Sequence, residues 1–257
     1  MFVRKKLIFI LISHLVLVGT VKAEIKPIYR IGVEDVSYYP LQNFQARENK
    51  GVLASILNLF ARTEGINIEF IPLPIHRFTA WFDEGNIDLR IPDHPVWSQS
   101  LQPELIYSAP VLLLCESTVV LAKNIDKSQS AIKSIGILHG FTPSRRWRKS
   151  IEKGEVELIS DASLKVLTRM LMNEMVDGLN VEYSAIQYQV KELGYDQSNV
   201  KISRRIPQTQ FSYHMSTIRH QDILKKFNDF LDRYRQEIIA IKRSHDFLSN
   251  RTCLPSD

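Results

Sequence analysis

The sequence is poor in the residues that mark several common classes of protein. Among 257 residues there are only two cysteines, Cys115 and Cys253. The seven histidines show neither an H-x-x-x-H spacing nor paired cysteines beside them, as a zinc site would require. There is also no G-x-S-x-G motif and no glycine-rich phosphate loop. We therefore expect no metal site and no cofactor.

A long hydrophobic run is absent as well. The apolar stretch from Leu7 to Val18 spans about a dozen residues, whereas a membrane-spanning helix needs about 20. Basic residues precede it at 4–6, and Val21-Lys22-Ala23 follows as a small-residue cleavage site. We predict a signal peptide over residues 1–23, cleaved after Ala23, with an uncleaved anchor as the alternative. No cysteine follows the apolar stretch, which excludes a lipid anchor at this cleavage site.

Most of the positive charge belongs to the predicted signal peptide. Four of the 33 lysines and arginines lie in residues 1–23, which leaves 29 against 28 acidic residues and a net charge of +1 instead of +5. So balanced a chain gives no reason to expect a nucleic-acid partner. The basic run 145–149 is interpreted as the solvated start of a helix, with a functional basic patch as the alternative.

The two cysteines suit an exported protein with one disulfide. In an oxidising compartment, two cysteines are the number required for a single bond. A Cys115–Cys253 bond would close a loop of more than 100 residues. In the chain-entropy account, such a bond stabilises the folded state by about 4–5 kcal/mol. A buried free thiol is the alternative for Cys115.

Strands and helices alternate along the chain. Apolar periodicity predicts strands at 29–33, 67–71 and 87–91, a helix opened by Gly51, and a short helix over 77–84. A second unit after Pro110 has predicted strands at 111–114, 118–122, 134–138 and 156–159, and a helix over 164–175. Residues 177–182 repeat the turn–strand–polar pattern of 85–93. This alternation predicts an α/β protein with a largely parallel sheet.

The tail over 219–247 is strongly helical, and its apolar stripe is interpreted as core packing rather than a partner surface. A different signal comes from the segment Pro92-Asp93-His94-Pro95, which follows a buried strand and loses backbone donors at both prolines. We interpret that segment as a loop that lines a ligand cleft.

Several short motifs, taken in order, resemble one family. They are "YRIGVEDVSYYP", "LPIHRFTAWFDEGNIDL", "IYSAP", "SIGILHGFT" and "MVDGLNVEYSA". Together they resemble the family 3 extracellular solute-binding proteins, the periplasmic receptors of polar amino-acid ABC transporters. The resemblance covers essentially the whole mature chain.

The resemblance implies an α/β, two-lobed type II periplasmic-binding-protein fold with a ligand cleft between the lobes. Lobe 1 would comprise 24–114 plus 212–257, and lobe 2 would be the continuous insertion 115–211. The strands that join them would cross near Cys115 and near 207–211. The implied protein is a periplasmic monomer that captures a small polar molecule, an amino acid or a relative, by hinge closure for an ABC permease.

The resemblance also assigns ligand residues. Tyr38 matches the aromatic residue that packs over the ligand, with Tyr39 beside it, and an ordinary surface aromatic is the alternative. Phe141 and Thr142 match a pair whose backbone and hydroxyl donors meet a ligand carboxylate. Glu182 matches the acid that receives the ligand ammonium group, and a solvated loop carboxylate is the alternative.

The sequence departs from the family at the carboxylate clamp. The family has an arginine near position 100, where this chain has Ser100, and the usual hydroxyl-rich loop is replaced by the segment that contains Asp93 and His94. Either Arg77, which fits a subgroup pattern, or Arg90 takes the role of the clamp, because a guanidinium suits a carboxylate. Otherwise the ligand is cationic or polyol-like and meets Asp93, Glu182 and Tyr38.

Two further functions stay open. The fold family includes periplasmic dehydratases such as cyclohexadienyl dehydratase, and Glu182 and His94 are candidates for acid–base chemistry. A ligand sensor that docks a separate membrane partner is the other alternative.

Overall fold

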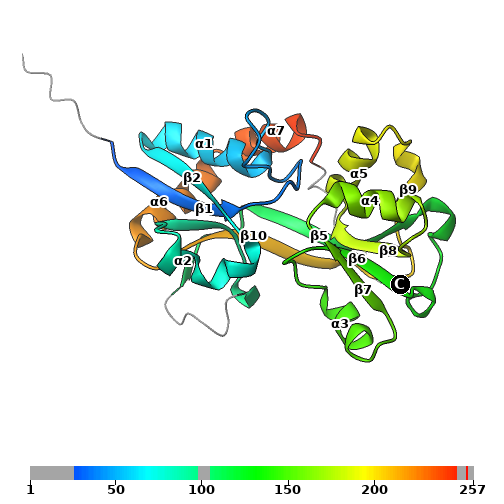
Figure 1. Ribbon diagram of the computed structural model, residues 1–257. Coiled ribbons are helices and arrows are strands. Elements are labelled where there is room, and N and C mark those ends of the chain that lie inside the picture. Colours follow the sequence, from blue (N-terminus) through cyan, green and yellow to red (C-terminus); the bar gives the residue numbers. More distant parts are fainter. Residues whose placement is uncertain (1–25, 98–104, 248–252, 254–257) are drawn as a thin grey trace, which may run out of the picture.

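The computed structural model describes residues 26–97, 105–247 and 253, and shows two α/β halves that share one sheet (Figure 1). The ten-stranded sheet has the order β2-β1-β3-β10-β5-β8-β6-β7, with β4 added at β10 and β9 at β5. The predicted α/β class is therefore confirmed. The parallel part of the sheet is divided between the two halves.

The first half contains the parallel strands β1 (Ile28–Glu34), β2 (Asn67–Leu73) and β3 (Leu89–Asp93). Strand β10 (Thr209–Thr217) runs antiparallel to β3 and to the short β4 (Ile106–Tyr107). The helices of this half are α1 (Val52–Glu64), α2 (Trp81–Glu84), α6 (Gln221–Arg233) and α7 (Arg235–Ser244), with 3-10 turns η1 (Ile75–Ala80) and η2 (Pro95–Trp97).

The second half is built on β6 (Ser134–Leu138), with β7 (Glu157–Asp161) and β8 (Gly178–Glu182) parallel to it. Strand β5 (Leu112–Leu121) pairs antiparallel with β8 and with β9 (Val200–Ile202). Helices α4 (Leu164–Met172) and α5 (Tyr183–Glu192) lie on one side of this sheet and α3 (Arg145–Glu152) on the other (Figure 1). The 3-10 turns are η3 (Ala122–Asn124), η4 (Gln129–Ala131) and η5 (Gln197–Asn199).

Strands β5 and β10 connect the halves. They pair antiparallel from Thr209↔Glu116 to Tyr213↔Leu112, and both run through the middle of the molecule (Figure 1). Because β1 and β3 in one half and β6 and β8 in the other end near these strands, the loops at their carboxyl ends face each other. Such carboxyl ends are where α/β sheets bind ligands.

Helix α1 starts at a residue that must be glycine. Gly51 has φ 95°, and a Cβ there would lie 2.8 Å from the carbonyl oxygens of Pro40 and Leu41. Only glycine enters this conformation without that clash. The Gly51 backbone therefore holds the loop that carries Tyr38 against the start of α1.

The apolar stripes of the helices form the core, as the tail pattern predicts. Within α6, Ile223, Leu224, Phe227 and Phe230 are buried, and Phe60 of α1 packs against both phenylalanines. The tail is not one helix, however, because Tyr234 leaves helical geometry (φ −104°, ψ 29°) and separates α6 from α7.

Three other local predictions need correction. The predicted strands 111–114 and 118–122 are the single strand β5, since Cys115, Glu116 and Ser117 stay extended and paired with β10 or β8. The helix predicted over 77–84 is the turn η1 followed by the four-residue α2. Strand β3 continues through Pro92 to Asp93, so these two residues do not belong to a loop.

The predicted disulfide is confirmed. Cys115 of β5 and Cys253 are bonded, with their Cα atoms 5.4 Å apart and a sequence separation of 138. The bond ties the C-terminal segment to a strand that connects the halves. For a loop of this length the chain-entropy account gives about 4–5 kcal/mol of stabilisation.

In the part of the chain that the structure describes, no helix is both long and apolar enough to cross a bilayer. The same residues contain no group of three or more His, Cys, Asp or Glu side chains arranged to hold a metal ion. The predicted signal peptide, residues 1–23, lies outside the described residues.

Candidate functional site

The two halves meet through the loops that follow β1 and β6. The amide N–H of Glu182 donates to the phenol oxygen of Tyr38 at 2.7 Å, and the Tyr38 ring lies edge-on to Phe141 with centroids 5.3 Å apart. Tyr38 is only 2% exposed. A residue of the first half is therefore enclosed by the second half, at the place where the sequence predicts an aromatic ligand contact.

A second contact lies at Gly140. This residue has φ 88°, and a Cβ built on it would lie 3.0 Å from Cβ and Cγ2 of Ile75 in the first half. A third contact involves Tyr39, whose ring lies 4.4 Å from that of Tyr188 on α5 and whose hydroxyl is 3.2 Å from Nδ1 of His245. The halves thus touch at two places besides Tyr38.

A buried carboxyl group, Glu34, ends strand β1 just before the Tyr38 loop. It is 3% exposed and accepts a hydrogen bond from Nε2 of Gln42, which is itself fully buried. Burial raises the pKa of Glu34 to about 8, a trend that the hydrogen bond from Gln42 opposes and the nearby Asp93 reinforces. The carboxyl group is therefore mostly protonated at neutral pH.

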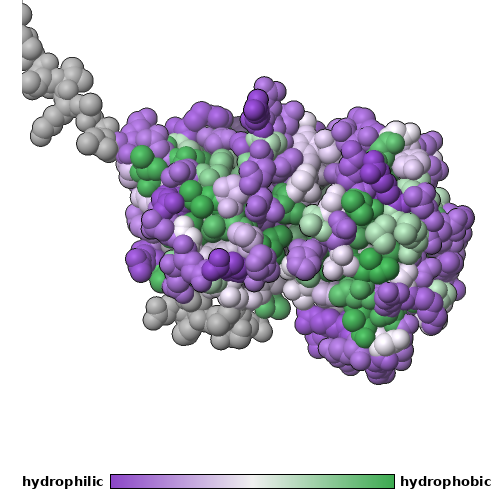
Figure 2. Space-filling view, in the orientation of Figure 1, coloured by the Kyte–Doolittle hydropathy of each residue, from purple (hydrophilic) through white to green (hydrophobic). Residues whose placement is uncertain are grey.

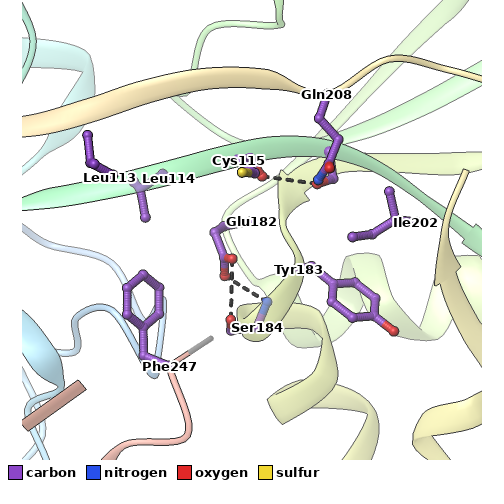
Figure 3. Close-up of a pocket in the computed structure, with 10 residues that line it drawn as sticks. Leu113, Leu114, Cys115, Glu182, Tyr183, Ser184, Ile202, Gln208 and Phe247 are labelled. Atoms are coloured by element: carbon purple, nitrogen blue, oxygen red, sulfur yellow. Dashed lines mark hydrogen bonds between the residues drawn. The ribbon is translucent and has the colours of Figure 1, made fainter. Parts of the chain in front are cut away.

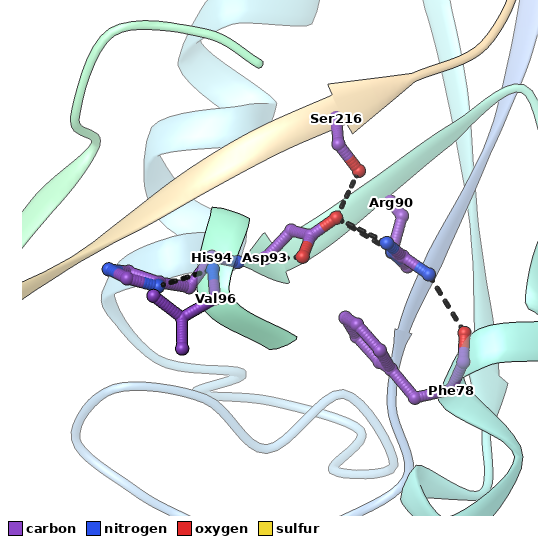
Figure 4. Close-up of polar contacts among 6 residues, drawn as sticks. All are labelled: Phe78, Arg90, Asp93, His94, Val96 and Ser216. Carbon is purple, nitrogen blue, oxygen red and sulfur yellow. Dashed lines mark hydrogen bonds and ion pairs between the residues drawn. The ribbon is translucent and has the colours of Figure 1, made fainter. Parts of the chain in front are cut away.

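Asp93 lies in strand β3 and its side chain is buried, so it does not line a loop. Its carboxylate is completely buried and is bound by the guanidinium of Arg90, whose Nε donates at 2.9 Å, and by the hydroxyl of Ser216 (Figure 4). Arg90 also donates to the carbonyl oxygen of Phe78 at 2.8 Å and lies over the Phe78 ring. Burial raises the pKa of Asp93, and the attraction of Arg90 opposes that rise.

This ion pair bears on two predicted ligand contacts. Arg90 was one of the two candidate clamps, yet its fork is held by Asp93 and a backbone carbonyl within the protein. Asp93 was predicted to meet a ligand from a loop, whereas the pleat of β3 turns its carboxylate into the interior. The two side chains therefore pair with each other in the interior of the protein (Figure 4).

Glu182 caps helix α5. Its carboxylate accepts from the amide N–H of Ser184 at 2.7 Å and of Ala185 at 3.3 Å (Figure 3). It also borders a small cavity with a volume of about 20 Å³, room for about one water molecule, formed by β5, the start of α5 and Phe247. A carboxylate can accept further hydrogen bonds, so the cap does not prevent contact with a ligand.

The remaining predicted residues are more exposed. Arg77 forms an ion pair with Glu84 on the surface, with 57% of its side chain exposed. His94 is half-buried, accepts from the amide N–H of Val96 at 3.1 Å, and lies beside Trp97. Thr142 is exposed in the loop between β6 and α3. The structure does not bring Arg77 into the buried cluster around Tyr38.

A polar cluster that sequence reasoning missed lies under the crossing strands. Glu116 of β5 is hydrogen-bonded to Asn180 and lies near Arg146 of α3. Arg146 donates to the hydroxyl of Thr209 on β10 at 3.0 Å, and Asn180 accepts the amide N–H of Ser144 at 2.8 Å. Burial raises the pKa of Glu116 to about 7, while Arg146 opposes the rise.

This cluster interacts electrostatically with the Tyr38 site. The charge of Glu116 raises the pKa of both Tyr38 and Tyr213, although burial is the larger cause for each, and Glu34 acts on the same two tyrosines. The only sequence signal for Glu34 and Glu116 was a charged residue at the end of, or inside, an apolar strand. The basic run 145–149 was interpreted as solvated, yet Arg146 is half-buried and Trp147 is fully buried.

Two α/β halves joined by crossing strands, with loops from each half meeting between them, define the type II periplasmic-binding-protein fold. A scan against models of known protein families found no match, and neither did a search of curated proteins. Solved structures do match. An ancestral arginine-binding protein bound to arginine is 19% identical over 86% of this chain and 99% of that one, with a TM-score of 0.66.

Two others extend the comparison. A substrate-binding protein of an amino-acid ABC transporter from Streptococcus pneumoniae, bound to L-arginine, is 14% identical over 87% of this chain and 97% of that one, with a TM-score of 0.66. An ancestral amino-acid-binding protein described as a precursor of cyclohexadienyl dehydratase is 12% identical over 85% and 95%, also with a TM-score of 0.66. At these identities the comparison establishes the fold, which is that of amino-acid-binding proteins of ABC transporters.

Proposed function

We propose that this protein captures a small polar solute between its two lobes and delivers it to an ABC permease from the periplasm. The proposed lobes are 24–114 plus 212–257 and 115–211, and the proposed working form is a monomer. The observation that carries the proposal is the contact of Tyr38 with Glu182 and Phe141 across the two halves.

Closure would be coupled to binding through these same groups. A solute that contacts residues of both lobes stabilises the closed form by the free energy of the contacts it makes only there. Tyr38 on the first lobe and Phe141, Thr142 and Glu182 on the second are proposed to make such contacts. The Ile75–Gly140 contact limits how far the lobes can approach.

A dehydratase-like enzyme is the second candidate, and one observation favours it. Glu116 and Glu34 have pKa values raised by burial to about 7 and about 8, near the range that a general acid needs. An exported protein that converts prephenate-like acids would support this candidate. Solute binding without any turnover would reject it.

A thermal-shift screen of the mature protein, residues 24–257, tests solute capture. The panel holds L-amino acids, amines, organic acids and sugars. A solute at about 100 times its Kd stabilises the folded state by about 2.7 kcal/mol, which raises Tm by several degrees for a chain of this size. Tyr38→Ala is expected to abolish the shift, whereas Tyr195→Ala, on an exposed tyrosine after α5, is expected to retain it.

No shift with any solute would contradict the proposal and would favour the sensor, in which a protein partner takes the place of the solute. A shift that survives Tyr38→Ala would show that binding occurs elsewhere on the protein.

A further inference from the structure

We propose that an open cavity at the outer end of the first half binds a phosphate monoester. The cavity has a volume of about 410 Å³, within the size range of ligand-binding pockets. Its polar lining consists of Lys26, Asn58, Arg62 and Asn67. The inference does not depend on solute capture between the halves, because it concerns a different part of the molecule.

The cavity lies at the amino ends of the strands, opposite to the cleft. Strands β1 and β2 are parallel and begin with Ile28 beside Asn67, whereas Glu34 and the Tyr38 loop follow at the other end of β1. With a rise of about 3.3 Å per residue, the seven residues of β1 put about 20 Å between its two ends. Figure 1 shows both strand starts and the end of α1 away from β5 and β10. The cavity is therefore separate from the groups that meet across the halves.

Local geometry brings the polar side chains of the cavity together. Asn58 and Arg62 are four residues apart on α1 and therefore lie on the same face of the helix. Gly65 then ends α1 in a left-handed conformation, with φ 66°, and the chain turns into β2. The amide N–H of Asn67 donates to the carbonyl oxygen of Pro27 at 2.9 Å, which holds the start of β2 beside the start of β1. The end of α1 and both strand starts thus meet around the cavity.

The two cations of the cavity have no acidic partner. No aspartate or glutamate is among the described residues that line it, and the side chains of Lys26 and Arg62 form no ion pair or hydrogen bond with the described residues. Glu64 and Glu69 flank the turn between α1 and β2, but each pairs with another arginine, at 3.7 Å and 3.6 Å. The cavity therefore carries two positive charges that attract an anion.

A phosphate monoester fits this set of donors better than a carboxylate does. Near neutral pH its phosphate carries a charge of about −1.5 to −2 and has three acceptor oxygens, whereas a carboxylate has one charge and two oxygens. Lys26 and Arg62 would balance that charge, and the guanidinium fork can bind two oxygens at once. The side-chain amides of Asn58 and Asn67 form no hydrogen bond with the described residues, so they are available to the phosphate or to hydroxyl groups of the ester.

The floor of the cavity suits the organic part of such an ester. Ala61 and Ile66 are 8% and 7% exposed and Ile68 is half-buried, so apolar surface lies beneath the polar side chains. Figure 2 shows hydrophobic residues framed by hydrophilic ones over β1 and β2 at this end of the molecule. The carbonyl oxygen of Ala61 is engaged, because it accepts from the amides of Gly65 and Ile66. The cavity has more room than a phosphate group fills, which favours an organic phosphate over inorganic phosphate.

Calorimetry of the mature protein, residues 24–257, tests the proposal with glycerol 3-phosphate, inorganic phosphate, glycerol and succinate. We expect glycerol 3-phosphate to bind most tightly and glycerol, which lacks the charge, not to bind. Arg62→Gln and Lys26→Gln should each weaken the binding of glycerol 3-phosphate by about 3- to 10-fold, as expected for one charged contact at a partly exposed site. The matched control is Arg47→Gln, on an exposed arginine in the connection before α1, which should leave the affinity unchanged.

Two further variants separate this cavity from the cleft and from a folding defect. Tyr38→Ala should retain the affinity for glycerol 3-phosphate. Arg62→Lys should retain more of the affinity than Arg62→Gln, because lysine keeps the charge but loses the fork. An affinity that falls in Tyr38→Ala but not in Arg62→Gln would place the phosphate in the cleft and overturn the inference.

Vesicles distinguish a soluble ester from a lipid that carries the same phosphate group. Sedimentation with phosphatidate vesicles but not with phosphatidylcholine vesicles, lost in Arg62→Gln, would support the site and assign its phosphate to a lipid. Binding of glycerol 3-phosphate without sedimentation would support the site and assign it to a soluble ester. Equal affinity for succinate would overturn the preference for phosphate. No binding of either phosphate probe, or equal binding by the wild type and Arg62→Gln, would overturn the inference and leave the proposed function unaffected.

Discussion

Replacing Glu34 by glutamine is expected to stabilise the protein at neutral and alkaline pH and to change its stability little at pH 5. The carboxyl group is 3% exposed, and burial raises its pKa from an ordinary 4.5 to about 8. The folded state therefore binds a proton that the unfolded state has released anywhere between these values. Stability that depends on Glu34 is lost as pH rises from 4.5 and reaches a constant minimum above 8.

The magnitude follows from the same two pKa values. At pH 7 the proton that Glu34 must take up on folding lowers the free energy of unfolding by about 3 kcal/mol. Each pH unit above 4.5 adds about 1.4 kcal/mol to this loss. At pH 5 the cost is below about 1 kcal/mol. Glutamine keeps the acceptor that Gln42 uses, and its amide N–H could donate to Oε1 of Gln42, which has no partner among the described residues. We therefore expect a gain of about 2–3 kcal/mol at pH 7.

Urea unfolding at pH 5, 6, 7 and 8, with the disulfide intact, measures this gain. Glu48→Gln is the control, since Glu48 is exposed on the same β1–α1 connection. A difference between Glu34→Gln and the wild type that does not change with pH would refute the reasoning. So would a wild type that is the more stable protein at pH 8.

Three further predictions concern the buried ion pair, the disulfide and the contact between the halves at Gly140. Asp93→Asn should destabilise the fold by about 3–5 kcal/mol, measured by urea unfolding, because it leaves Arg90 buried without its partner; a loss below 1 kcal/mol would show that water reaches the pair. Cys253→Ala should cost about 4 kcal/mol, and the difference should vanish when both proteins are unfolded under reducing conditions. Gly140→Ala should weaken solute binding by pressing on the side chain of Ile75, and adding Ile75→Ala should restore part of the affinity; no restoration would assign the loss to the strained backbone at φ 88°.

The sequence predicted the fold well where periodicity is strong. The strand–helix alternation and the disulfide are confirmed, because apolar spacing and an isolated pair of cysteines each constrain the structure directly. The prediction from the sequence was wrong where burial in the tertiary structure outweighs the local sequence pattern. Asp93 reads as a loop residue after a proline, yet tertiary pairing with β10 extends the strand and Arg90 neutralises the charge.

The candidate site was predictable only in part. The structure places Tyr38 between the halves, as a motif at the end of a strand suggested. Glu116 and Arg146 gave no usable signal, since they lie 30 residues apart in sequence and meet only because α3 packs beneath β5 and β10. A basic run on a helix is ordinarily solvated, and only the fold shows that one of its arginines turns inward.

Small-angle X-ray scattering of the wild-type protein, with and without a solute that the screen identifies, tests the central claim most directly. Capture between the lobes predicts a smaller radius of gyration with the solute than without it. A radius of gyration that stays constant while the solute binds would contradict closure around the ligand.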